Sequence, residues 1–121
     1  MPKLIMIVDD SPSLRQVLAI TLRSAGYEVL EACDGLDALN KLSGQPISLV
    51  ISDVNMPNMD GLAFIGELKK NPAYKCAPVI MLTTEMGEDK RRAGQSAGAK
   101  AWMIKPFQPR QILSAVERLA M

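Results

Sequence analysis

The stretch ISDVNMP, residues 51–57, joins an apolar run to a single carboxylate and then to a proline. Residues 49–51 supply the run, Leu-Val-Ile, and Asp53 is the first charged residue after it. A short apolar run without polar alternation is typical of a strand buried on both faces of a parallel sheet. Pro57 lacks a backbone N–H and cannot continue such a strand. The stretch therefore predicts a buried strand that presents Asp53 at its carboxyl end.

Four other segments have the character of strands. Three apolar runs, at residues 4–8, 79–82 and 101–104, are expected to be buried on both faces, as is the run at 47–51. The segment YEVLEA, which begins at Tyr27, alternates polar and apolar side chains, as a strand at the edge of a sheet does. The sequence therefore predicts five strands.

Helical patterns of apolar residues lie between these strands. Ser11 and Pro12 fit the N-cap and the first position of the first helix, and Gly26 fits its end. The second, third and fifth helices are expected to begin close to Asp34, Asp60 and Pro109. Strand and helix thus alternate along the chain, which is the pattern of parallel strands joined by right-handed helical crossovers.

The predicted fourth helix, GEDKRRAGQSAG at residues 87–98, differs from the others. It offers only Ala93 and Ala97 as apolar contacts, and Gly94 in its interior costs roughly 1 kcal/mol against alanine. We expect this helix to be the least firmly held of five. The predicted architecture is one doubly wound α/β domain over residues 1–121, with five parallel strands, five helices and no attached output domain.

Composition excludes several classes of function. Lysine and arginine number 14 against 13 aspartate and glutamate residues, so neither nucleic acid nor a membrane surface is an expected partner. No stretch approaches the roughly 18 apolar residues of a membrane span, and the first residues lack the pattern of a signal peptide. Cys33 and Cys76 lie far apart in a sequence without histidine, which argues against a zinc site. We interpret both as reduced thiols of a cytoplasmic protein.

Polar residues follow the predicted strands where each strand stops. They are Asp9 and Asp10 after the first strand, Asp53 after the third, Thr83 and Thr84 after the fourth, and Lys105 after the fifth. The carboxyl ends of parallel strands share one edge of the sheet, which is where open α/β sheets bind their ligands. Asp9 and Asp10 have a simpler role available, as helix caps, but capping uses one residue and Ser11 already serves.

The chemistry of this set points to phosphoryl transfer. Clustered carboxylates repel one another, so at neutral pH they require a cation or a bound proton. Oxygen ligands without histidine or thiolate suit Mg²⁺. Three carboxylates, one Mg²⁺ and Lys105 carry no net charge together, so the site can receive an anion. With a hydroxyl from Thr83, the set can neutralise a phosphoryl group that is transferred to a carboxylate.

Four motifs give the sequence a resemblance to a known family. They are VDDS at residues 8–11, SDVNMPNMDG at 52–61, MLTTE at 81–85 and KPF at 105–107. In this order, at the ends of four predicted strands, they resemble the receiver domain of two-component response regulators, closest to stand-alone chemotaxis regulators of the CheY type. The resemblance covers essentially the whole chain. It implies a flavodoxin-like fold with strand order 2-1-3-4-5 and a cis peptide bond before Pro106.

The resemblance also implies roles at the acceptor site. Asp53 corresponds to the phosphoacceptor, and Asp10, Asp53 and the backbone carbonyl of Asn55 correspond to direct Mg²⁺ ligands. Asp9 would act mainly through metal-bound water, and Lys105 would contact a phosphoryl oxygen. The protein would catalyse only its own phosphorylation and dephosphorylation.

A second set of residues corresponds to the switch and output positions of the family. Thr83 would turn its hydroxyl toward the phosphoryl group, and Thr84, Glu85 and Trp102 lie at the switch and output positions. Trp102 stands where tyrosine or phenylalanine is commoner, and Thr84 where alanine or glycine is commoner. A plain strand role for Thr83 and a core role for Trp102 are the structural alternatives. The output surface is expected on the fourth helix, the fifth strand and the fifth helix.

The implied function is a monomeric, phosphorylation-controlled switch in chemotaxis. Its partners would be a chemotaxis-type histidine kinase upstream and a flagellar motor switch protein or a phosphatase downstream. A phosphate sink without a motor target is the alternative within the family. A phosphatase of the haloacid dehalogenase type is disfavoured, because Asn55 stands where that chemistry uses a second aspartate. A flavodoxin-type electron carrier is disfavoured because the acidic strand ends would repel a flavin phosphate.

Overall fold

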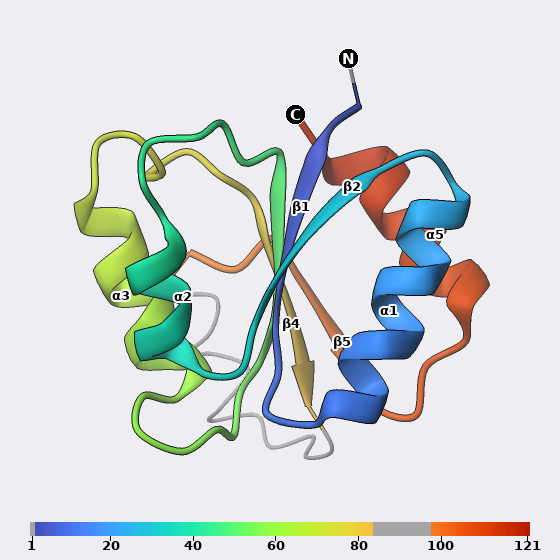
Figure 1. Ribbon diagram of the computed structural model, residues 1–121, viewed down its shortest axis with the longest axis horizontal. Coiled ribbons are helices and arrows are strands. Elements are labelled where there is room, and N and C mark those ends of the chain that lie inside the picture. Colours follow the sequence, from blue (N-terminus) through green and yellow to red (C-terminus); the bar gives the residue numbers. More distant parts are fainter. Residues whose placement is uncertain (1, 84–97) are drawn as a thin grey trace.

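The computed structural model describes residues 2–83 and 98–121, and the strands in these ranges form one parallel sheet (Figure 1). The strands are β1 (Leu4–Val8), β2 (Glu28–Ala32), β3 (Leu49–Asp53), β4 (Val79–Thr83) and β5 (Ala101–Ile104). Their order in the sheet is β2-β1-β3-β4-β5, and every neighbouring pair is parallel. The predicted fold class and strand order are thereby confirmed.

Helices cover both faces of the sheet. They are α1 (Pro12–Ser24), α2 (Gly35–Lys41), α3 (Gly61–Lys70) and α5 (Pro109–Leu119). Figure 1 shows α1 and α5 on one face and α2 and α3 on the other. The predicted fourth helix falls almost wholly on residues 84–97, outside the described residues. No helix in the described ranges has both the length and the apolar character needed to cross a membrane.

The alternation of side chains along the buried strands produces two apolar cores, one for each face. On β1, Ile5 and Ile7 pack in the cluster that contains Leu18 of α1, whereas Met6 and Val8 pack in the cluster that contains Phe64 of α3. All six side chains are fully buried. A strand with both faces buried carries no polar alternation, which is why β1 appears in the sequence as a continuous apolar run.

The helix starts follow from local capping. Ser11 accepts a hydrogen bond from the backbone N–H of Leu14, at 3.3 Å, and Asp34 and Asp60 accept equivalent bonds at 2.8 Å. Each cap satisfies a backbone donor that the first helical turn leaves without a partner. Gly26 follows the end of α1 with φ of +94°, a conformation that favours glycine. The predicted boundaries at these four residues are confirmed.

Two expectations about the strands need correction. The third strand begins at Leu49 rather than at residue 47, and it extends through Asp53, so the carboxylate belongs to the strand itself. The fifth strand was expected to be buried on both faces, but all four of its residues are only half-buried. The reason is its place at the edge of the sheet, where β4 is its one neighbour among the described strands.

Gly61, the first residue of α3, is where the helix approaches the end of β3 most closely. Its backbone N–H donates to the carbonyl of Val54 at 2.8 Å. A Cβ atom at this position would lie 2.1 Å from the backbone oxygen of Asp53 and 2.9 Å from Cε of Met81. Only glycine permits this approach, which fixes the start of α3 against the strand end that carries Asp53.

We predict opposite effects for alanine at the two glycines of α3. Gly61→Ala should lower the free energy of unfolding by about 1–3 kcal/mol, because the new methyl group overlaps rigid backbone. Gly66→Ala should raise it by up to about 1 kcal/mol, because this exposed helical position has nothing within 4 Å of a Cβ. Urea titration of both variants checks the prediction, and a Gly61→Ala protein as stable as the wild type would contradict it.

Candidate functional site

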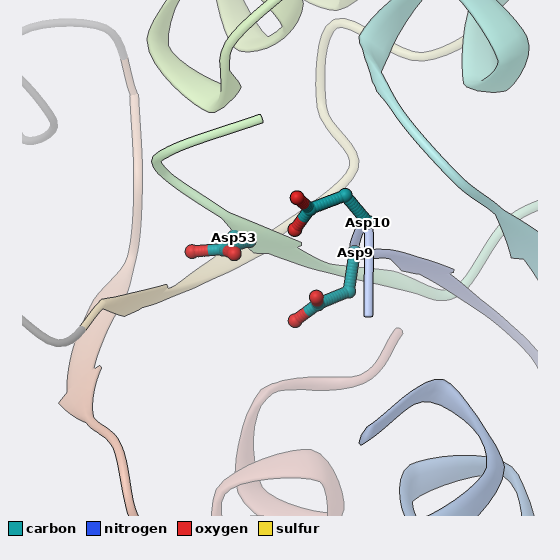
Figure 2. Close-up of side chains that lie close together, drawn as sticks. All are labelled: Asp9, Asp10 and Asp53. Atoms are coloured by element: carbon teal, nitrogen blue, oxygen red, sulfur yellow. The ribbon is translucent and has the colours of Figure 1, made fainter. Parts of the chain in front are cut away.

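Three carboxylates gather at the carboxyl edge of the sheet. Asp9 and Asp10 follow β1, and Asp53 is the last residue of the neighbouring strand β3. Each offers a carboxylate oxygen, and these oxygens all lie within 4.8 Å of one another. Figure 2 shows the side chains of Asp9 and Asp10 extending from one short stretch toward Asp53. The convergence expected from the strand ends is therefore present.

The three carboxylates differ in their exposure and partners. Asp9 is 1% exposed and Asp53 is 7% exposed, whereas Asp10 is exposed. One carboxylate oxygen of Asp9 accepts a hydrogen bond from the backbone N–H of Ser11 at 2.9 Å. Within the described residues, the Asp10 carboxylate has no hydrogen bond or ion pair. Asp10 is thus the carboxylate most open to an incoming ligand.

Lys105, just after β5, bridges the two buried carboxylates. Its ammonium group lies 2.8 Å from Oδ2 of Asp9 and 3.0 Å from Oδ2 of Asp53. Its backbone N–H donates to the carbonyl of Thr83 at 2.8 Å, which ties the residue to the end of β4. The Lys105–Pro106 peptide bond is cis, as the resemblance implied. The sequence placed Lys105 at this edge, and the structure shows which two carboxylates it contacts.

The surroundings of Asp53 and Lys105 shift the pKa values of both groups. Burial raises the pKa of Asp53, and the nearby Asp9 adds to this, although the contact with Lys105 acts in the opposite direction. Burial alone would lower the pKa of Lys105, but its hydrogen bonds to Asp9 and Asp53 outweigh burial and leave that pKa above its ordinary value. Among the described residues, the Lys105 ammonium is the one positive group that contacts this cluster of three carboxylates, so a further cation would stabilise their ionised forms.

The donor set fits a hard divalent cation. It consists of carboxylate oxygens from Asp9, Asp10 and Asp53, and Asn55 follows two residues later in the exposed loop after β3. Oxygen ligands and partial access to solvent suit Mg²⁺, which retains several water ligands when it binds to proteins. The cluster can therefore bind a metal, and the proposed backbone contribution of Asn55 is compatible with its position.

The remaining predicted residues divide into two groups. Thr83 is fully buried at the end of β4, next to the strand that carries Asp53, and Trp102 is half-buried in the middle of β5, paired with Met81. The indole Nε1 of Trp102 is buried and has no hydrogen-bond partner among the described residues. Thr84 and Glu85 lie outside the described residues.

Sequence reasoning missed Arg15, which supports the site from α1. Its guanidinium donates to the backbone carbonyl of Asp9 and lies 3.7 Å from the carboxylate of Glu31. It therefore links the loop after β1 to strand β2. The available signal was a basic residue in the first turn of a helix, where acidic residues are usually favoured.

Asp34 is a second supporting residue that the sequence marked only as a helix start. Its buried carboxylate accepts a hydrogen bond from Asn58 at 2.7 Å, and the N–H of Gly35 donates to the carbonyl of Met59 at 3.2 Å. Hydrogen bonds from the Asp37 backbone and from Asn58 lower the pKa of Asp34 and keep it ionised. These contacts fasten α2 to the loop that also carries Asn55.

Comparison with known proteins agrees with this geometry. The chain matches the response regulator receiver domain over residues 5–117. It is 36% identical to chemotaxis protein CheY1 of Helicobacter pylori over 115 residues, which cover 93% of each chain. It is 33% identical to protein PilG of Pseudomonas aeruginosa over 113 residues, 93% of this chain and 84% of that protein.

A solved structure of chemotaxis protein CheY4 of Vibrio cholerae superposes with a TM-score of 0.94 at 41% identity, covering 98% of this chain and 99% of that one. The family match runs from the second residue of β1 to α5 and includes the residues of the carboxylate cluster. Sequence, sheet order and site geometry therefore agree, and the chain belongs to the response regulator receiver domain family.

Proposed function

We propose that this chain is a phosphorylation-controlled signalling switch that accepts a phosphoryl group on Asp53 from a histidine kinase. The observation that carries the proposal is the placement of the Asp53 carboxylate, 3.0 Å from the ammonium of Lys105 and within 4.8 Å of two further carboxylates. Membership of the receiver family places the chain among signalling proteins of two-component systems rather than among classical enzymes.

In the proposed reaction, a carboxylate oxygen of Asp53 attacks the phosphorus of a phosphohistidine. The phosphorus–nitrogen bond breaks, the histidine leaves with the bond electrons, and an acyl phosphate forms on Asp53. Lys105 already contacts Asp53, and its ammonium would remain beside the negative phosphoryl oxygens. Thr83, on the adjacent strand end, would donate its hydroxyl to the same group.

The proposed metal site uses Asp10, Asp53 and the backbone carbonyl of Asn55. When bound there, Mg²⁺ would neutralise charge on the phosphoryl oxygens. Both carboxylate oxygens of Asp9 already have partners, Ser11 and Lys105, so its proposed contribution to metal binding is through water. Asp9 would also hold the ammonium of Lys105 in position beside Asp53.

The proposed output surface comprises the predicted fourth helix, which falls almost wholly outside the described residues, together with β5 and α5. A pocket of about 440 Å³ is lined there by Trp102 and by Arg110 and Arg118 of α5, among other residues. The names of the relatives support a role in chemotaxis, and we propose a flagellar motor switch protein as the downstream partner. Residues 1–121 would act as one receiver domain in the cytoplasm and signal through this surface.

Asp53 is predicted to be the only phosphoacceptor. Incubation with acetyl phosphate and Mg²⁺ should add one phosphoryl group to the wild-type protein and none to Asp53→Asn, which lacks the nucleophilic carboxylate. Intact-protein mass spectrometry measures the product. Glu67→Gln, which removes an exposed carboxylate of α3, is the control and should react like the wild type. If the Asp53→Asn protein still gains a phosphoryl group, Asp53 is not the only phosphoacceptor.

Mg²⁺ affinity is predicted to fall in acid and on loss of Asp10. Because the pKa of Asp53 is raised, protons compete for its carboxylate at a higher pH than for an ordinary aspartate, so affinity should decrease as pH falls toward that pKa. Asp10→Asn removes a direct ligand and should weaken binding at least about tenfold, since even outer-shell changes cost this much. Calorimetric titration at several pH values, with Asp37→Asn as control, provides the measurement. Unchanged affinity in Asp10→Asn would exclude it as a ligand.

Trp102 is predicted to report phosphorylation. Its buried indole N–H has no hydrogen-bond partner in the part of the chain that the structure describes. Such an arrangement costs about 1–3 kcal/mol and favours any rearrangement that supplies a partner. Beryllofluoride with Mg²⁺, which mimics the phosphoryl group, should change the emission and the acrylamide quenching of this single tryptophan. The same addition to Asp53→Asn should have no effect. An unchanged signal with the acceptor site occupied would place the output surface elsewhere.

A further inference from the structure

A second charged site lies at the opposite edge of the sheet from Asp53. It is a pocket of about 380 Å³ lined by residues from three separate segments: Lys69, Lys75, Cys76, Gly98 and Lys100. Lys69 is in the last turn of α3, Lys75 and Cys76 precede β4, and Lys100 immediately precedes β5. The backbone N–H of Lys100 donates to the carbonyl of Val79 at 2.8 Å, which places the pocket where β4 and β5 begin.

The pocket concentrates positive charge in a chain with a net charge of only +1. Three lysines line it, and no aspartate or glutamate is among the described residues that do so. Within the described ranges, no carboxylate lies within 4.0 Å of the ammonium of Lys69, Lys75 or Lys100. Lys70, the neighbour of Lys69 on α3, differs because it pairs with Glu67 at 3.1 Å. The positive charge of the pocket is therefore not neutralised by these described residues.

Contacts with Ala77 and Gly98 hold the Lys69 side chain in place in the pocket. Its ammonium donates to the backbone carbonyl of Ala77, and its stem passes under Gly98, where a Cβ would lie 3.2 Å from Cε of Lys69. Gly98 has φ of +109°, so the close approach and the backbone conformation both favour glycine. Partial burial lowers the pKa of Lys69; the neighbouring Cys76 acts in the opposite direction, and the charge of Lys100 adds to the lowering. A fixed ammonium that is already partly desolvated is suited to meet an anion.

We propose that this pocket binds a small multivalent anion of the phosphate class, such as a pyrophosphate group. Among the described residues, the lining contains lysines and no arginine. Lysine binds phosphate as a point charge, whereas bidentate carboxylate recognition favours arginine. The anion would join the end of α3 to the segments before β4 and β5. This site is separate from the Asp53 site and does not depend on the proposed phosphoryl transfer.

The two cysteines give the site an internal reporter and a matched control, because both are exposed. Cys76 lines the lysine pocket. Cys33 lies beside acids: its backbone N–H donates to Asp37 at 2.9 Å, and partial desolvation with the carboxylates of Asp37 and Asp34 raises its pKa. A negatively charged thiol reagent should therefore reach Cys76 readily and Cys33 poorly.

The test measures protection of Cys76 by pyrophosphate. Cys33→Ser and Cys76→Ser proteins each retain one thiol, which reacts with dithiobis-nitrobenzoate, a dianionic disulfide. Pyrophosphate at ten times its dissociation constant should slow the reaction of Cys76 by about tenfold and leave that of Cys33 unchanged. Sodium chloride at equal ionic strength controls for screening. Metal is omitted, so that the Asp53 site keeps its net negative charge and does not attract the anion.

Lysine variants connect protection to the pocket. In the Cys33→Ser background, Lys75→Gln with Lys100→Gln should abolish protection of Cys76 and binding of pyrophosphate in calorimetry. Lys3→Gln with Lys70→Gln removes the same charge outside the pocket and should preserve both. Three results would overturn the proposal: pyrophosphate slows the reaction of Cys76 no more than sodium chloride does, it slows the reaction of Cys33 equally, or it still binds after loss of Lys75 and Lys100. Protection by citrate but not by pyrophosphate would overturn the assignment to phosphates.

Discussion

The ammonium of Lys105, between the buried carboxylates of Asp9 and Asp53, is the interaction on which the carboxyl edge of the sheet depends. Without it, two ionised groups that are 1% and 7% exposed would face each other with no counter-charge among the described residues. The strand order makes the contact possible, because Lys105 follows β5 and reaches across the end of β4 to β3 and β1. One lysine thus joins three strand ends, while the site still carries the excess negative charge that favours a metal.

Backbone contacts around the site hold these charges at fixed positions. Gly61 lets α3 begin against the carbonyl of Asp53, and Asp34 fastens the start of α2 to Asn58 in the intervening loop. Arg15 holds the carbonyl of Asp9 from the other face. These contacts come from helices on both faces of the sheet (Figure 1). The position of the Asp53 site therefore depends on packing on both faces.

Charge is segregated between the two edges of the sheet. The carboxylates gather where the strands end, and Lys69, Lys75 and Lys100 gather where β4 and β5 begin. Part of this polarity follows from helix dipoles, since α3 ends with basic residues, which favour a helix C-terminus. A nearly neutral chain thereby carries an acidic cluster and a basic cluster. Its net charge alone does not reveal either cluster.

Local signals in the sequence determined the strands, the helix starts and the acidic cluster. An apolar run reveals a buried strand, Ser11, Asp34 and Asp60 each cap the helix that directly follows, and parallel strands bring their carboxyl ends together. Tertiary structure alone decided that β5 is half-buried, that Lys105 contacts Asp9 as well as Asp53, and that Arg15 supports the site. It also decided that three lysines distant in sequence share one pocket. Those features depend on contacts between side chains that are distant in sequence. Such contacts form only when the whole core packs, so local sequence patterns do not reveal them.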